Sequence, residues 1–166
     1  MTENRSVVIG LGNPLMSDDG FGLRVLQRLI EAYEMPPDVE LVDGGTWGLS
    51  LLPAVESSRR LLLIDAIDIG VTPGEVVSLT SDEIPGMLSM KVSPHHVDML
   101  DVLALTRLRG TRPAELLAIG VQPECVNFGL GLSDCVESRI DDVADRVVRQ
   151  LQAWGHPCVD RALAHA

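Results

Sequence analysis

The sequence of 166 residues contains few aromatic residues. Phe, Trp and Tyr make up 3% of it, whereas hydrophobic residues as a whole make up 46%. A chain of this length can form one domain with a sizeable core, and this core must consist mainly of Leu, Val, Ile and Ala. We therefore expect residues 1–166 to form a single domain.

Positive charge is also scarce. The chain has 13 Lys and Arg against 24 Asp and Glu, which gives a formal net charge of -11 at pH 7. A phosphate backbone is bound by clustered Lys and Arg, so this balance argues against a nucleic-acid partner. It is compatible with a soluble protein whose partner is neutral or basic.

Cysteines and long apolar runs are few. The three cysteines, at positions 125, 135 and 158, include no CxxC pair, which argues against structural disulfides and zinc knuckles and favours a reducing compartment. No fully apolar run exceeds four residues, as in LLLI at 61–64, and the first ten residues contain no apolar segment of signal-peptide length. We expect a cytoplasmic protein without membrane insertion.

Short β-rich runs alternate with helical patterns along the chain. Strands are predicted at 6–10, 60–68 and 74–80, and two more open the segments VELVDGGT (39–46, strand then turn) and ELLAIGVQPE (115–124, strand then loop). Helices are predicted at 20–33, 47–55, 93–108 and 133–154. This order predicts an α/β fold: a three-layer α/β/α single domain with a twisted, largely parallel sheet of about five strands.

The helix predicted over 93–108 has a clear start signal. Ser93 is a favoured N-cap residue, and Pro94 is favoured at the first helical position. We assign to its inward face Val97, Leu100, Leu103, Ala104 and Leu108, and Gly110 ends it.

Polar residues gather where strands of this sheet would end. In open α/β sheets, binding sites form beyond the carboxyl ends of the strands. The segments GLGNPLMSDDG and DAID follow two such strands, and KVSPHH opens a helix. They can bring Asp19, Asp65 and His95 into one cleft. Two carboxylates and an imidazole suit a divalent cation of intermediate hardness.

Each of these residues also has a purely structural interpretation. Asp18 is expected to cap the helix that follows, and Asp19 can simply favour the helix dipole. Asp65 can bond loop amides, and Asp43 is expected in a turn before two glycines. His96, beside His95, is expected to face solvent.

Five motifs, in order and spacing, resemble the hydrogenase maturation protease family. They are GLGNPLMSDDGFGLRV, DGGTWGLSLL, LLLIDAIDIG, KVSPHHVDMLDVL and IGVQPE. The resemblance implies an endopeptidase that removes the C-terminal extension from the precursor of a [NiFe] hydrogenase large subunit. It also implies a twisted sheet between helices, which agrees with the order of the predicted elements.

The resemblance assigns roles to three positions. Three residues match the metal-contacting residues of the family: Asp19, Asp65 and His95. At the position of Asp19 the family often has Glu. These three residues are the implied catalytic and metal site. The metal is nickel that arrives already inserted in the precursor, so no tightly held cofactor is expected. The sequence offers no convincing nucleophile, so water is the expected attacker; the metal can activate it, or one carboxylate can act as general base.

Three other functions remain open from the sequence. A dinucleotide-binding domain is disfavoured because Leu15 stands where GxGxxG needs its third glycine, and acids follow. A peptidyl-tRNA hydrolase-like enzyme shares the GLGNP start, but its His/Asn motif is absent and the net charge suits tRNA poorly. A non-enzymatic nickel-binding maturation chaperone could use the same three ligands.

Overall fold

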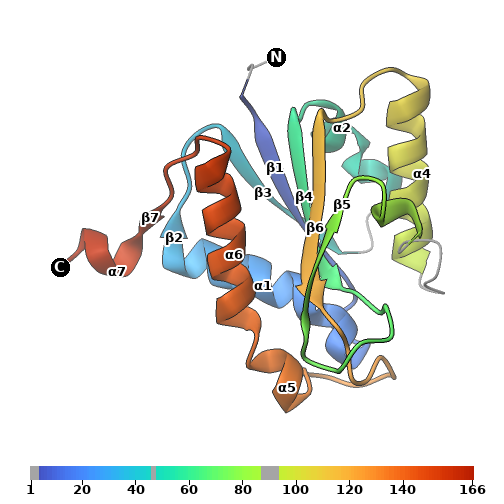
Figure 1. The fold of residues 1–166 in the computed structure, drawn as a ribbon, viewed down its shortest axis with the longest axis vertical. Coiled ribbons are helices and arrows are strands. Elements are labelled where there is room, and N and C mark those ends of the chain that lie inside the picture. Colours follow the sequence, from blue (N-terminus) through green and yellow to red (C-terminus); the bar gives the residue numbers. More distant parts are fainter. Residues whose placement is uncertain (1–3, 46–47, 87–93) are drawn as a thin grey trace.

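The computed structural model describes residues 4–45, 48–86 and 94–166, with the backbone alone for residues 94–98. A five-stranded sheet in the order β3-β1-β4-β6-β5 forms its centre (Figure 1). The strands are β1 (Ser6–Leu11), β3 (Val39–Gly45), β4 (Arg60–Ala66), β5 (Val76–Thr80) and β6 (Glu115–Val121). β3, β1, β4 and β6 are parallel, whereas β5 runs antiparallel to β6. The predicted largely parallel sheet of about five strands is confirmed.

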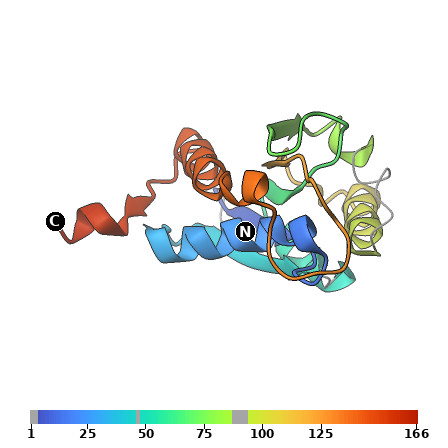
Figure 2. The same cartoon turned by 90° about the horizontal axis from the view of Figure 1, so that it is seen from below.

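Helices cover both faces of this sheet, as Figures 1 and 2 show. One face carries α1 (Phe21–Ala32) and α6 (Ile140–Ala153), and the other carries η2 (Gly48–Leu51), α2 (Leu52–Glu56) and α4 (Pro94–Leu108). The predicted three-layer α/β/α architecture is therefore confirmed. In the described part of the chain, no helix is both long and apolar enough to cross a bilayer.

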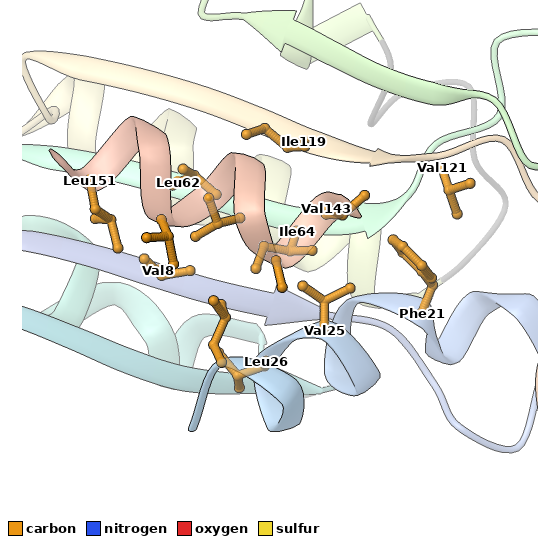
Figure 3. Packing of buried hydrophobic residues seen from close by; sticks show 14 of the residues in the cluster. Val8, Phe21, Val25, Leu26, Leu62, Ile64, Ile119, Val121, Val143 and Leu151 are labelled. Atoms are coloured by element: carbon orange, nitrogen blue, oxygen red, sulfur yellow. The ribbon is translucent and has the colours of Figure 1, made fainter. Parts of the chain in front are cut away.

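The central strands are buried on both faces. Val8, Leu62 and Ile64 pack against α1 and α6, together with Val25 and Leu151 (Figure 3). Their neighbours along the strands, Val7, Ile9, Leu61 and Leu63, pack on the opposite side with residues of α2 and α4. This double burial explains why β4 is a continuous apolar run rather than an alternating one.

The predicted inward face of α4 is only partly right: Leu100 and Leu103 pack against the core, as predicted. The helix begins at Pro94, as predicted, and among its described side chains the fully buried ones are Met99, Val102 and Thr106. Leu108 is 83% exposed, and Ala104 is exposed as well; Val97 lies outside the described side chains. Apolar residues occur on every side of this helix, so their spacing did not distinguish the buried face.

The helix predicted over 133–154 is two helices, α5 (Asp134–Glu137) and α6. The Ser138 hydroxyl donates to the Cys135 carbonyl at 3.0 Å, and the Arg139 amide bonds to Val136 instead of to Cys135. A serine side chain that competes for a backbone carbonyl in this way interrupts a helix.

The sequence analysis also missed a small accessory sheet. β2 (Tyr33–Glu34) pairs antiparallel with β7 (Val159–Asp160), and α7 (Arg161–Ala164) follows. α1 therefore ends at Ala32, and Tyr33, predicted as the last residue of this helix, is part of β2. These strands have only two residues each, too few to give a periodic pattern.

Candidate active site

Two buried carboxylates lie at the edge of the sheet where the parallel strands end. Asp65 is the next-to-last residue of β4 and is fully buried; its Oδ1 accepts the Ala66 N–H at 2.8 Å. Asp19 belongs to η1 (Ser17–Gly20), which follows β1 and packs against β4. Its side chain is 6% exposed, and Oδ2 accepts the Asn13 N–H at 3.1 Å. Because β1 and β4 are neighbours, the two acids occupy adjacent strand ends.

Glycines allow the segment between β1 and α1 to pack this tightly. Gly12 has φ +133, and a Cβ there would lie 1.8 Å from the Asp19 carbonyl oxygen. A Cβ on Gly22 would lie 2.2 Å from the Ile64 oxygen and 2.3 Å from the Leu11 oxygen. Only glycine permits these approaches. They press the first turn of α1 onto β1 and β4 and so fix Asp19 at the strand ends.

Asp18 does not cap α1, so the predicted cap is wrong. The N-cap position of α1 is Gly20, without a side-chain bond. Instead, the fully buried Asp18 carboxylate accepts bonds from the backbone amides of Glu124, Cys125 and Ser133, at 2.8, 2.9 and 2.7 Å. The Ser133 hydroxyl donates to both of its oxygens, at 3.0 and 2.8 Å. Asp18 therefore anchors a loop that lies more than 100 positions further along the chain.

These bonds keep Asp18 ionised. Burial alone would raise the pKa of Asp18, but the bonds from Cys125, Ser133 and Glu124 outweigh it and hold the pKa below the ordinary value of 3.8. A charged carboxylate is a stronger acceptor than a neutral one, so the anchor is strongest in this form.

Residues 123–133, which we call the anchored loop, run from β6 to α5. Backbone bonds join the loop to the segment before α1: Ser17 N–H to Gly129 O at 2.9 Å, and Gly129 N–H to Leu15 O at 2.8 Å. The Asp18 amide in turn donates to Cys125 O at 3.0 Å. In Figure 2 the loop (orange) passes across the blue start of α1. The loop and the segment that bears Asp19 thus form one bonded unit.

Gln122 organises the neighbouring loop after β4. Its side chain is buried, and its Oε1 accepts the N–H groups of Ile69 and Val71 at 3.0 and 3.3 Å. Its Nε2 donates to Asp68 Oδ1 at 2.9 Å. The sequence analysis assigned no role to Gln122, although this residue lies in the motif IGVQPE. The signal that could have identified it is an amide side chain directly after a predicted strand.

Comparisons with known proteins identify the family of this chain. Residues 23–150 match the hydrogenase maturation protease (HycI) family. Hydrogenase 2 maturation protease of Escherichia coli K12 is 34% identical over 162 residues, which cover 97% of this chain and 99% of that one. Hydrogenase expression/formation protein HupD of Rhodobacter capsulatus is 40% identical over 153 residues, covering 91% and 73%. The chain belongs to the hydrogenase maturation protease family.

A solved structure supports the same assignment. The hydrogenase maturating endopeptidase HybD from E. coli superimposes on 95% of this chain and 98% of its own, with a TM-score of 0.91 and 34% identity. The chain is therefore a peptidase, and the peptide-bond hydrolase predicted from the motifs is confirmed. The dinucleotide-binding, peptidyl-tRNA hydrolase and chaperone alternatives lose their support.

The structure of this maturation protease places some predicted site residues and not others. Asp19 and Asp65 come to adjacent strand ends, as predicted. Asp43 is not a turn residue: it is exposed and lies within β3, paired with Gly10. His95 lies in the first turn of α4, but its side chain, like that of His96, is outside the described residues. Among the side chains that are described, no group of three potential ligands clusters in a metal site.

Proposed function

We propose that this protein is the endopeptidase that removes the C-terminal extension from the nickel-loaded precursor of a [NiFe] hydrogenase large subunit. Cleavage is the final step of maturation, and it lets the new C-terminus fold inward and close the metal site. The observation that carries the proposal is the burial of Asp19 and Asp65 on adjacent strand ends in a chain of the maturation protease family.

Asp19, Asp65 and His95 would contact the nickel that the precursor brings. Carboxylate oxygens and an imidazole nitrogen suit this ion, and three ligands leave coordination positions for the precursor's own groups. α4, whose first turn contains His95, starts at the lower end of the view in Figure 1, where β4 and β6 also end, and this supports the assignment of His95 to the same site as the two acids.

The reaction is hydrolysis of one peptide bond. A water oxygen attacks the scissile carbonyl carbon, a base takes the water proton, and the C–N bond breaks as the amine leaves with a proton. One of the two carboxylates would act as that base. Nickel next to the bond would polarise the carbonyl or activate the water.

The choice of substrate follows from this scheme. We expect purified protein to cleave the nickel-loaded precursor and to leave the nickel-free precursor, casein and short peptides of the cleavage sequence intact. Mass spectrometry of the precursor after incubation gives both the cleavage site and the rate. Cleavage of the nickel-free and nickel-loaded precursors at equal rates would contradict the proposal.

Nickel should also bind weakly to the protein alone. Titration calorimetry with nickel should give a signal for the wild type that His95→Ala loses, whereas His165→Ala, at an exposed position directly after α7, should retain it. Unchanged nickel binding by His95→Ala would remove His95 from the site. We also propose that the protein acts in the reducing cytoplasm, in keeping with Cys125, Cys135 and Cys158 as thiols.

A further inference from the structure

Large exposed hydrophobic side chains gather at the edge of the sheet that bears Asp19 and Asp65. The described part of the chain has ten of them, and six lie on segments that directly follow the four parallel strands. They are Leu15 after β1, Leu49 after β3, Ile69 after β4, and Val126, Phe128 and Leu130 after β6. Apolar side chains collected at one edge, rather than scattered, are typical of an interaction surface.

The anchored loop contributes three of the six. Phe128 and Leu130 are 82% and 83% exposed, the largest exposures in this set together with that of Leu108. The chain has only two phenylalanines, and the other, Phe21, is fully buried. Aromatic side chains are enriched where proteins contact one another, so an exposed one on a loop beside a site is informative.

The loop is held in place while it presents these side chains. The Asp18 carboxylate accepts three of its backbone amides, and the Ser17 hydroxyl donates to Asn127 O at 2.8 Å. Gly129, which lies between Phe128 and Leu130, makes two backbone hydrogen bonds: its N–H donates to Leu15 O, and its carbonyl oxygen accepts the Ser17 N–H. A surface ordered in advance loses less conformational entropy when a partner binds to it.

The position of the surface identifies its occupant. Asp18 and Asp19 are consecutive, and one anchors the loop while the other lies at the candidate active site. A protein substrate whose scissile bond lies at Asp19 must therefore pass the anchored loop. A second copy of this chain and an anionic lipid surface are both disfavoured, because the chain carries a net charge of -11.

We infer that Phe128 and Leu130 of the anchored loop, with Leu15 beside them, bind an apolar surface of the hydrogenase large-subunit precursor near its cleavage site. This inference rests on the proposed function and adds the surface by which the enzyme holds its protein substrate. This surface contributes to the affinity for the precursor, whereas Asp19 and Asp65 act on the scissile peptide bond.

Two matched double variants test the inference. Phe128→Ser/Leu130→Ser removes two apolar side chains from the loop, and Leu108→Ser/Leu163→Ser removes two of similar exposure from α4 and α7. Cleavage of the nickel-loaded precursor is measured over a range of precursor concentrations. The loop variant should need about tenfold more precursor for half-maximal rate, while its maximal rate changes less than about twofold. The control should match the wild type in both quantities, and thermal melts should show that both variants fold.

The outcomes separate this inference from the proposed function. If the wild type cleaves the precursor and the loop variant behaves like its control, the docking surface is wrong although the function stands. If the wild type does not cleave, the function fails, and biolayer interferometry on immobilised precursor still compares the two variants. Sedimentation velocity provides a further check: a loop variant that loses self-association but keeps its affinity for the precursor would assign the surface to a second copy of the chain and overturn the inference.

Discussion

At the scale of single residues, two consecutive aspartates have unrelated tasks. The Asp18 carboxylate accepts hydrogen bonds from the backbone amides of Glu124, Cys125 and Ser133, so its role is structural. The Asp19 carboxylate accepts the Asn13 N–H and lies at the strand ends. Both residues are buried aspartates, and they differ in their hydrogen-bond partners.

Asp18→Asn should destabilise the protein by about 2–4 kcal/mol, because an NH2 group would face buried N–H donors that need an acceptor. The exposed Asp82→Asn should change stability by less than about 0.5 kcal/mol. Urea unfolding gives both values, and hydrogen exchange should locate the loosening in the anchored loop. Wild-type stability in Asp18→Asn would show that the Asp18 bonds contribute little.

The sequence could not reveal the task of Asp18. A carboxylate just before a helical stripe is a common N-cap, so local pattern favoured that interpretation. The actual donors lie 106 to 115 positions away, and all but the Ser133 hydroxyl are backbone amides, which carry no side-chain signature. Asp19 and Asp65 were predictable at strand ends because buried strands followed by acids leave a clear local pattern.

At the scale of elements, the strands were predictable and the faces of some helices were not. β4 is a run of large apolar residues bounded by Arg60 and an acid, and such a run identifies a doubly buried strand. α1 and α6 have one apolar stripe each, which the packing uses. In α4 the apolar residues are not confined to one stripe, so contacts with the neighbouring η2 and α2 determine which side is buried.

A pair of substitutions tests the observed orientation of α4. Val102→Ala should cost about 1–3 kcal/mol in unfolding free energy, because Val102 is fully buried between α4 and the sheet. Leu108→Ala, at a position that is 83% exposed, should cost less than about 0.5 kcal/mol. Chemical unfolding of both variants provides the comparison. A larger loss of stability in Leu108→Ala than in Val102→Ala would contradict the observed orientation and support the burial of Leu108 predicted from the sequence.

At the scale of the whole molecule, the two edges of the sheet at which the strands begin and end have different roles. The carboxyl edge carries Asp19, Asp65 and the anchored loop. At the opposite edge, the Ser6 hydroxyl and His156 Nε2 lie 2.7 Å apart, where they join β1 to the segment that follows α6. Both residues are buried, and this contact ties the C-terminal part of the chain to the sheet.

His156 should make stability depend on pH. Burial, with the nearby Arg60 charge, holds the pKa of His156 below its ordinary value of 6.5. The unfolded chain therefore binds the proton more readily, so this contribution is complete above pH 6.5 and is lost as pH falls below it. Urea unfolding at about pH 7.5 and about pH 5.5 should show a loss of stability that is smaller in His156→Gln. An equal loss in both proteins would assign the pH dependence to other groups.

The central claim is that the carboxyl edge of the sheet is where the precursor is cut, and rates of cleavage of the nickel-loaded precursor test it most directly. Asp19→Asn, Asp65→Asn and His95→Ala should each lower the rate by at least about a hundredfold, the scale expected for loss of a general base or a metal contact. Asp82→Asn should cleave at the wild-type rate, and all four variants should fold. A well-folded Asp19→Asn protein that cleaves the precursor at the wild-type rate would contradict the account.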